Sequence, residues 1–185
     1  MFRHSIRALA ALTALAACTA APQQRPDQPP LAQGEIAREV VDAQAAQHIE
    51  TFDTLDFVVF SNQQWDRLHE SHAEDIIVTW PDGHDTNGIE THIHDLQQLF
   101  VHAPDTRIDL HPIRIGSGEW TAVTGVMTGT FTQPMRMADG TVIQPTGRAF
   151  SLPMATIAHW SDGRIDHEWL YWDNQTYMRQ LGLAE

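Results

Sequence analysis

The chain has 185 residues, of which 42% are hydrophobic, and this is enough for one domain with a packed core. Its 11 basic residues are all arginines and face 24 acidic residues, so the net charge is −13. This charge disfavours a nucleic-acid-binding role, because contact with phosphates needs a basic surface. The single cysteine excludes an internal disulfide.

The first 34 residues are expected to lie outside the folded domain. Arg3 and Arg7 precede an apolar run, residues 8–17, that is too short to span a bilayer. Residues 15–18 (Leu-Ala-Ala-Cys) resemble a bacterial lipobox, so we expect residues 1–17 to be a signal peptide and Cys18 to be lipidated. An ordinary secretory signal with an incidental cysteine is the alternative. Residues 18–34, rich in Pro and Gln, then form a flexible linker.

These features predict an exported lipoprotein on the periplasmic side, and Thr19 after the cysteine favours the outer membrane. Two of the arginines precede Cys18, so nine remain against 24 acids and the mature chain has a net charge of −15. Anionic lipid surfaces repel such a body. We therefore expect membrane contact only through the N-terminal lipid.

The folded domain, residues 35–185, begins with helical periodicity. We expect one or two helices over residues 35–60, and a short one over residues 63–72. Residues 76–80 are β-branched and aromatic, which predicts a strand. Asn87 with Glu90 three residues later predicts a capping box at the start of a helix that ends before Pro104.

After this helix the pattern changes to that of strands. Four segments are strand candidates, and turn residues separate them: 106–115, 119–131, 142–160 and 164–172. Asp173 then predicts the N-cap of a last helix, which ends at Gly182. Helices followed by an antiparallel sheet indicate an α+β fold.

The turn at Asp162-Gly163 predicts a hairpin, and its register sorts the side chains of the last strand. Regular pairing outward from this turn puts Ala158 opposite His167. His167 is then expected to share an apolar face with Met154, Thr156, Trp169 and Tyr171. Glu168 is expected on the opposite face, where Asp166 would pair with His159.

Several short motifs together resemble the SnoaL-like polyketide cyclase and ester cyclase family, within the nuclear transport factor 2-like superfamily. The similarity runs from about His48 to Leu183. The motifs that carry it occur in family-like order: Ala73-Glu74-Asp75-Ile76-Ile77, Pro81 with Gly88, Ala103-Pro104-Asp105, Pro145-Thr146-Gly147-Arg148, Asp162-Gly163-Arg164-Ile165, Trp169 and Gln180-Leu181-Gly182. The resemblance implies a cone of helices packed on a curved, mostly antiparallel sheet, one apolar pocket, and a homodimer.

The resemblance also implies chemistry without a cofactor. In the cyclases of this family, a pocket carboxylate on the last strand shuttles a proton during an intramolecular aldol closure. The matching position here is interpreted as His167, an imidazole that an apolar surround would keep as a neutral base. The alternative is that His167 only fills the core.

The remaining candidates form the walls of a hydrophobic pocket. Trp80 and His84 flank the turn after the first strand, while Met154, Thr156, Trp169 and Tyr171 share the predicted face of His167. The alternative is ordinary core packing for Trp80, Met154, Trp169 and Tyr171, strand propensity for Thr156, and solvent exposure for His84. The 11 histidines show no zinc-binding spacing, so no metal is expected.

The family resemblance and the candidate pocket residues lead to two functional hypotheses. One is a cyclase or isomerase that uses acid–base chemistry on a small hydrophobic carbonyl compound, with His167 as the proton shuttle. The other is a non-catalytic, lipid-anchored module that binds a small molecule or mediates assembly. A second polar group in the pocket, able to stabilise an oxyanion, would favour the enzyme.

Overall fold

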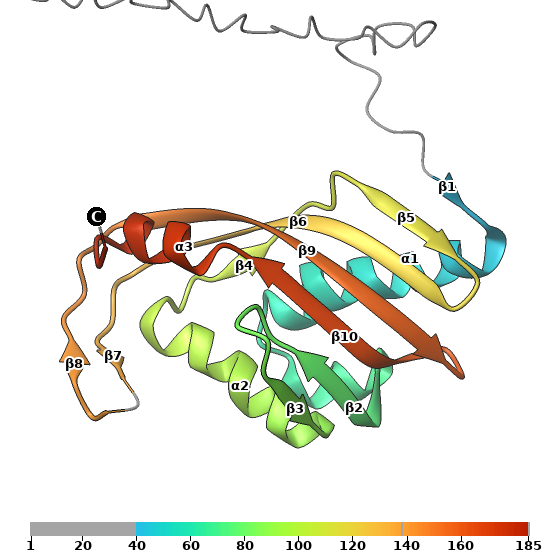
Figure 1. Cartoon of the computed structure of the whole chain (residues 1–185), viewed down its shortest axis with the longest axis horizontal. Coiled ribbons are helices and arrows are strands. Elements are labelled where there is room, and N and C mark those ends of the chain that lie inside the picture. The colour runs from blue at the N-terminus through green and yellow to red at the C-terminus, as the bar shows by residue number, and fades with distance from the viewer. Residues whose placement is uncertain (1–39, 138, 185) are drawn as a thin grey trace, which may run out of the picture. The chain divides into compact units, whose positions relative to one another are not determined.

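The computed structural model describes residues 40–137 and 139–184, and Figure 1 shows their arrangement. A long, curved sheet has α1 and α2 on its concave side. The helical elements are α1 (Ala43–Thr54), the π-helix η1 (Leu55–Phe60), the 3-10 helix η2 (Trp65–Glu70), α2 (Ile89–His102) and α3 (Asn174–Leu181). The segments expected to form the signal peptide and linker, with Cys18, lie outside the described residues.

The sheet confirms the predicted α+β class and is mixed but mostly antiparallel. Its strand order is β1-β5-β6-β9-β10-β2-β3, with β4 also paired to β6. The strands are β1 (Val40–Val41), β2 (His72–Thr79), β3 (Asp85–Asn87), β4 (Arg107–Ile108), β5 (Arg114–Ser117), β6 (Trp120–Thr130), β9 (Ala149–Ser161) and β10 (Arg164–Trp172). A separate hairpin joins β7 (Met135–Arg136) to β8 (Val142–Ile143). The pairs β10–β2 and β1–β5 are parallel.

Helix ends agree in part with the sequence. The Asp173 side chain accepts from the backbone N–H groups of Gln175 and Thr176, and Gly182 closes α3 in the left-handed region, as predicted. The capping box at Asn87 is wrong: α2 begins after Gly88, whose φ of 87° favours glycine, and it has no side-chain cap. Within the described residues, no helix is long and apolar enough to cross a membrane.

The hairpin between β9 and β10 forms at the predicted turn, but its register changes after two residue pairs. Asp162 and Gly163 both have positive φ, which suits a two-residue hairpin turn, and Ile165 pairs with Trp160 as expected. The register then shifts, and His167 instead of Asp166 is the backbone partner of His159, although the predicted side-chain contact between Asp166 and His159 forms at 2.6 Å. Asp166 is thus the extra residue of a β-bulge.

Because of this bulge, each side chain along the rest of β10 points to the face of the sheet opposite to the one predicted. Glu168 is the partner of Ala158, and both are buried. His167 and Trp169 point to the other side of the sheet, because side chains alternate along a strand. The prediction that placed His167 on the inner face and Glu168 on the outer face is therefore wrong.

The core lies between the sheet and the helices. Trp160 is fully buried there, its indole N–H donates to the Thr121 hydroxyl at 2.9 Å, and His48 stacks on its ring. Phe52 and Leu68 are equally enclosed. This packing fixes the sheet against α1 and leaves a pocket farther along the concave face.

Candidate active site

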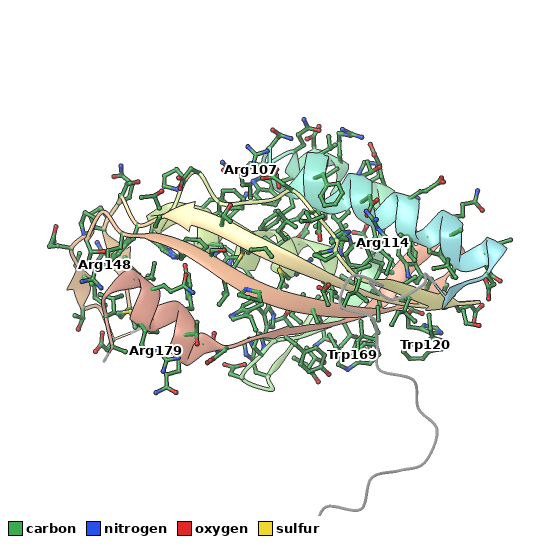
Figure 2. All side chains as sticks on the ribbon, turned by 90° about the horizontal axis from the view of Figure 1, so that it is seen from above. Arg107, Arg114, Trp120, Arg148, Trp169 and Arg179 are labelled. Carbon is green, nitrogen blue, oxygen red and sulfur yellow. The ribbon has the colours of Figure 1, made fainter. Side chains whose placement is uncertain are left out.

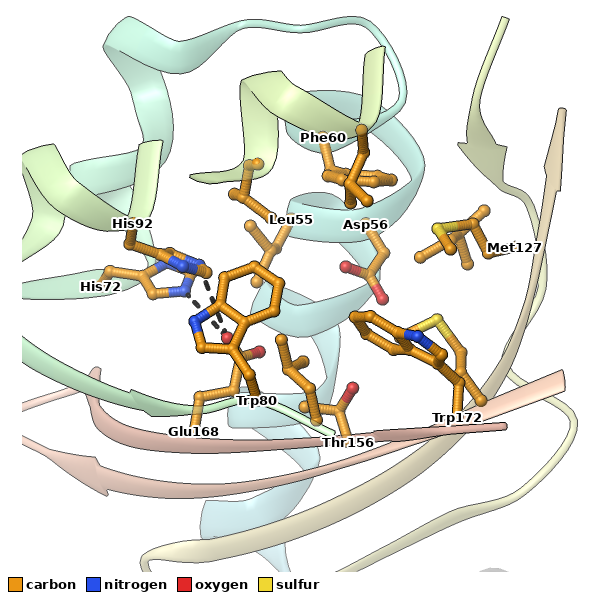
Figure 3. A pocket seen from close by; sticks show the side chains of 15 residues that line it. Leu55, Asp56, Phe60, His72, Trp80, His92, Met127, Thr156, Glu168 and Trp172 are labelled. Carbon is orange, nitrogen blue, oxygen red and sulfur yellow. Dashed lines mark ion pairs between the residues drawn. The ribbon is translucent and has the colours of Figure 1, made fainter. Parts of the chain in front are cut away.

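A pocket opens between η1, α2 and the concave face of the sheet (Figure 3). Most of its wall is apolar or aromatic: Leu55, Phe60, Trp80, Leu96, Leu99, Ile108, Met127, Met154, Leu170 and Trp172. Five polar side chains complete it: Asp56, His72, Thr156, Glu168 and His92. Such a lining suits a hydrophobic ligand held by a few polar groups.

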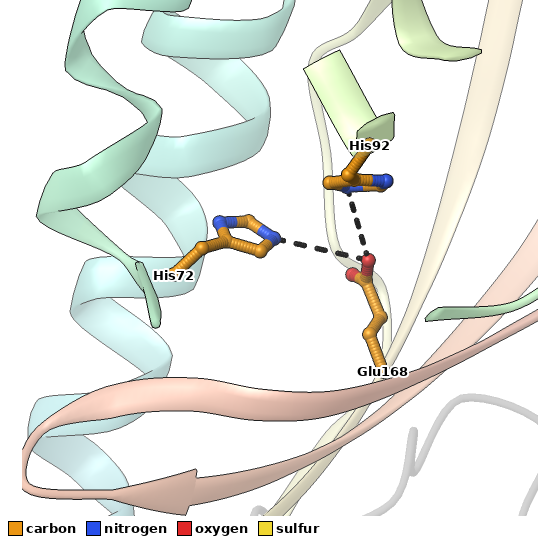
Figure 4. A group of neighbouring side chains, drawn as sticks. All are labelled: His72, His92 and Glu168. Carbon is orange, nitrogen blue, oxygen red and sulfur yellow. Dashed lines mark ion pairs between the residues drawn. The ribbon is translucent and has the colours of Figure 1, made fainter. Parts of the chain in front are cut away.

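Glu168 is the central polar group of the pocket. Its side chain is 6% exposed and faces two histidines that come from separate elements (Figure 4). One carboxylate oxygen, Oε2, lies 3.5 Å from Nε2 of His92 and 3.8 Å from Nε2 of His72. Burial acts to raise the pKa of Glu168, but the two histidines outweigh it and hold the pKa below its usual value. The carboxylate is thus ionised at neutral pH and can accept a proton.

His72 is held by its neighbours in one orientation. The Ser71 hydroxyl donates to the carbonyl oxygen of Leu68, so its oxygen is left to accept from Nδ1 of His72, 2.9 Å away. Nε2 of His72 then faces Glu168 and has no hydrogen-bond partner within the described residues.

His92 reaches the same carboxylate from α2. It is 2% exposed, and this burial lowers the pKa of His92 to about 4. The imidazole is therefore neutral at neutral pH. A neutral His92 adds no charge of its own to the pocket, and its Nε2 can carry a hydrogen toward Glu168.

A second carboxyl group, Asp56, enters the pocket from the helical side. Its oxygen Oδ2 lies 2.8 Å from Nε2 of His111, whose Nδ1 lies 2.7 Å from Oδ1 of Asp53. Arg114 donates to the other oxygen of Asp53 at 2.9 Å. His111 is 1% exposed, whereas the Asp53 side chain is 30% exposed, so this chain of contacts leads from the pocket toward solvent.

The electrostatics of Asp56 and His111 follow from this arrangement. Burial raises the pKa of Asp56, because the hydrogen bond and charge of His111 do not fully offset it and the negative charge of Glu168 adds to it. Burial acts to lower the pKa of His111, but its two carboxylate partners outweigh this and raise it. Both groups therefore favour their protonated forms more than they would in water.

The predicted pocket residues divide between the two faces of the sheet. Trp80, Met154 and Thr156 line the pocket, as the sequence indicates. His84 lies next to Trp80, with parallel rings 6.1 Å apart, but its side chain is 56% exposed and contacts Asp82.

His167, Trp169 and Tyr171 lie instead on the outer face. The His167 ring stacks on Trp169 at 3.6 Å, and Trp169 stacks on Trp120 from β6. Figure 2 shows Trp120 and Trp169 on the side of the sheet away from α1. We call the group Trp120, His159, His167, Trp169 and Tyr171 the outer aromatic face.

Four polar groups of the site were not predicted to face the pocket, Asp56, His72, His92 and Glu168, although two of them carried a signal in the sequence. His92 lies three residues after Ile89 and four before Leu96, which puts it on the apolar stripe of its helix. Asp56 similarly lies four residues from Phe52 and from Phe60. A polar residue inside an apolar stripe is a candidate site residue. His72 gave no such signal, because the sequence places it in a helix.

The trio His72, His92 and Glu168 has the donor set of a divalent metal site. The three donor atoms lie within 4.8 Å of one another, and all three residues are buried. Tetrahedral zinc, with bonds of about 2.0–2.1 Å, needs donors roughly 3.3 Å apart. The distances of 3.5 and 3.8 Å from the histidine nitrogens to Glu168 exceed this value, so the three side chains would have to move closer together to hold a metal ion.

Comparison with known proteins agrees with this fold. The model of the SnoaL-like polyketide cyclase family matches residues 39–181, and the chain belongs to this family. No curated protein matches the chain. The structure resembles a proposed SnoaL-like polyketide cyclase from Jannaschia sp. CCS1, with 18% identity and a TM-score of 0.68 over 80% of this chain and all of that one.

Two Streptomyces proteins are also similar. IdmH of Streptomyces antibioticus, a proposed polyketide cyclase, is 25% identical, with a TM-score of 0.63 over 74% of this chain and 99% of its own. TsrD of Streptomyces laurentii is 18% identical, with a TM-score of 0.61 over 79% of this chain and all of its own. The fold is therefore the nuclear transport factor 2-like cone that the sequence resemblance implied.

Proposed function

We propose that this protein is a cofactor-independent cyclase or isomerase that moves a proton on a small hydrophobic carbonyl compound, with Glu168 as its acid–base residue. The observation that supports this most is a buried carboxylate, on the last strand, between two imidazoles in an apolar pocket. The role expected for His167 thus passes to Glu168. The chain then has an acid at the position where the family resemblance implies one.

Glu168 would take the proton from the carbon next to the carbonyl group, and the C–H electrons would form the enolate. The pocket is lined mostly by apolar side chains, and Glu168 stays ionised within it, so its carboxylate can act as the general base. His72 and His92 hold Glu168 ionised before the step. Returning the proton to another carbon gives isomerisation, and attack of the enolate on a second carbonyl group gives ring closure.

The test uses full-length protein in detergent and 2-tetralone, a small hydrophobic ketone. Exchange of its α-protons in D₂O is followed by NMR, and Glu168→Gln is expected to reduce the catalysed rate by at least 100-fold, within the range for lost general-base catalysis. His167→Gln is the matched control, since it is the adjacent residue on the opposite face and should exchange like the wild type. Binding without exchange above the buffer rate would overturn the proposal and favour the binding module.

We also propose that the outer aromatic face joins two copies into the expected homodimer. Trp120 and Tyr171 are each 50% exposed, and Ile115 and Ile157 beside them are also exposed. A monomer rarely leaves such a cluster open to water. Analytical ultracentrifugation should give a dimer for the wild type and a monomer for Trp120→Glu; a monomeric wild type would contradict this.

Attachment to the membrane is proposed to occur through lipidated Cys18, with the domain on the periplasmic side of the outer membrane. The lipobox-like residues 15–18 support this. Labelling cells with a radioactive fatty acid should mark the wild type and not Cys18→Ser. Equal labelling of both would refute the assignment.

A further inference from the structure

We propose that Asp56 is a second catalytic residue, a carboxylic acid whose pocket-facing oxygen donates a hydrogen bond to the carbonyl oxygen of the substrate. This inference rests on the proposed function and names the group that stabilises the enolate. The proton on carbon goes to Glu168, the C–H electron pair forms the carbon–carbon double bond, and the carbonyl π electrons move to oxygen. The charge on that oxygen is met by Asp56.

The position of Asp56 suits this role. It comes from η1, on the wall of the pocket opposite the β10 strand that carries Glu168 (Figure 3). A planar carbonyl compound between these walls would present its acidic carbon to one carboxyl group and its oxygen to the other. The remaining wall offers apolar and aromatic contacts that can hold the ring of a hydrophobic substrate.

The hydrogen bonds of Asp56 leave one oxygen available. Its Oδ2 is occupied by Nε2 of His111 at 2.8 Å, and within the part of the chain that the structure describes Oδ1 has no hydrogen-bond partner. Asp53 lies 2.7 Å from the other nitrogen of His111, so an imidazolium at this position donates one N–H to each carboxyl group. With Oδ2 accepting from His111, a proton on Asp56 belongs on Oδ1, where it faces the pocket.

Charge within the pocket favours a neutral Asp56. Two carboxylates that share one apolar cavity repel each other, so one of them retains its proton. Glu168 is the ionised partner by its position, because its carboxylate faces two imidazoles, those of His72 and His92. Asp56 is the neutral one, because the charge of His111 is already matched by Asp53, which Arg114 also contacts. Opposite protonation states give the pair one base and one donor.

Two substitutions at position 56 test whether its role is to donate a hydrogen bond. Asp56→Asn keeps a donor, because the amide oxygen can accept from His111 while the amide N–H faces the pocket. Asp56→Leu removes the donor at similar volume. We expect 2-tetralone exchange to fall about 100-fold in Asp56→Leu, as for loss of one oxyanion donor, and less than 10-fold in Asp56→Asn. Equal loss in both variants, or wild-type exchange in Asp56→Leu, would overturn the donor role.

A second measurement does not depend on turnover. In the Glu168→Gln background the pocket has the charge of the protonated intermediate, and 2-naphtholate serves as a stable mimic of the enolate. Its affinity, measured by fluorescence, should fall about 100-fold when Asp56→Leu is added, and less than 10-fold with Asp56→Asn. Unchanged affinity in the Asp56→Leu double variant would overturn the inference.

The two proposals fail in different ways. If exchange depends on Glu168 but not on Asp56, the proposed function remains and this inference is wrong. If no exchange occurs but naphtholate affinity follows the donor pattern, Asp56 recognises an oxygen atom of a bound ligand and the enzymatic function is wrong. Circular dichroism melts of each variant confirm that the fold is retained, and Asp56→Asn keeps the contact to His111 should Asp56→Leu fail to fold.

Discussion

Replacing His92 by leucine should make the stability of the protein less dependent on pH. His92 is 2% exposed, and burial lowers its pKa from 6.5 to about 4. In the unfolded chain His92 takes up a proton as the pH falls through about 6.5, whereas in the folded protein it stays neutral until about pH 4. Acidification therefore favours the unfolded state across this window, and the loss of stability is complete below about pH 4.

The size of the effect follows from the two pKa values. A gap of about 2.5 between them corresponds to about 3 kcal/mol in the free energy of unfolding over the full window. The interval from pH 7 to pH 5 covers only part of this window, so the expected loss in the free energy of unfolding over it is about 2 kcal/mol. Other titrating groups contribute in the wild type and the variant alike, so their effects cancel in the difference.

Urea denaturation at pH 7 and pH 5 measures this directly. The wild type should lose about 2 kcal/mol more than His92→Leu on acidification. His94 lies on the same helix with a side chain 69% exposed, so His94→Leu is the matched control and should behave as the wild type. If His92→Leu retained the full wild-type loss, His92 would not be the buried neutral imidazole described above.

Two further predictions concern the site. The rate of 2-tetralone exchange should be bell-shaped in pH, because the lowered pKa of Glu168 puts the acid limb below its usual value and the raised pKa values of Asp56 and His111 set the alkaline limb. The titratable groups around Asp56 and His111 are Asp53, Glu168, His72 and His92. Asp53→Asn should move the alkaline limb of the rate profile to lower pH, because it removes the charge that stabilises the His111 imidazolium. An alkaline limb at the wild-type pH would contradict this. EDTA should leave exchange unchanged, whereas zinc chloride should inhibit it by occupying His72, His92 and Glu168, and this inhibition should be lost in His92→Leu; activity abolished by EDTA would instead indicate a metal-dependent reaction.

Local chemistry determined much of this fold before any tertiary contact was considered. Asp162-Gly163 sets a two-residue turn because both positions need positive φ, and Asp173 with Gly182 fixes the ends of the last helix. The order of helices and strands, with the family motifs along it, indicated the α+β cone. Met154 and Thr156 were found because strand periodicity holds along β9, and Trp80 because it flanks the turn after its strand.

Only the tertiary structure decided which ionisable groups face the pocket. One extra residue at Asp166 shifts the pairing of β10 and exchanges His167 for Glu168, because side chains alternate at every position of a strand. A bulge arises from contacts with the neighbouring strands, so the turn by itself does not reveal it. His72 and Asp56 come from segments that meet Glu168 only when the sheet curves around the helices. The sequence contained both carboxyl groups of the site, and folding brought them to opposite walls of one pocket.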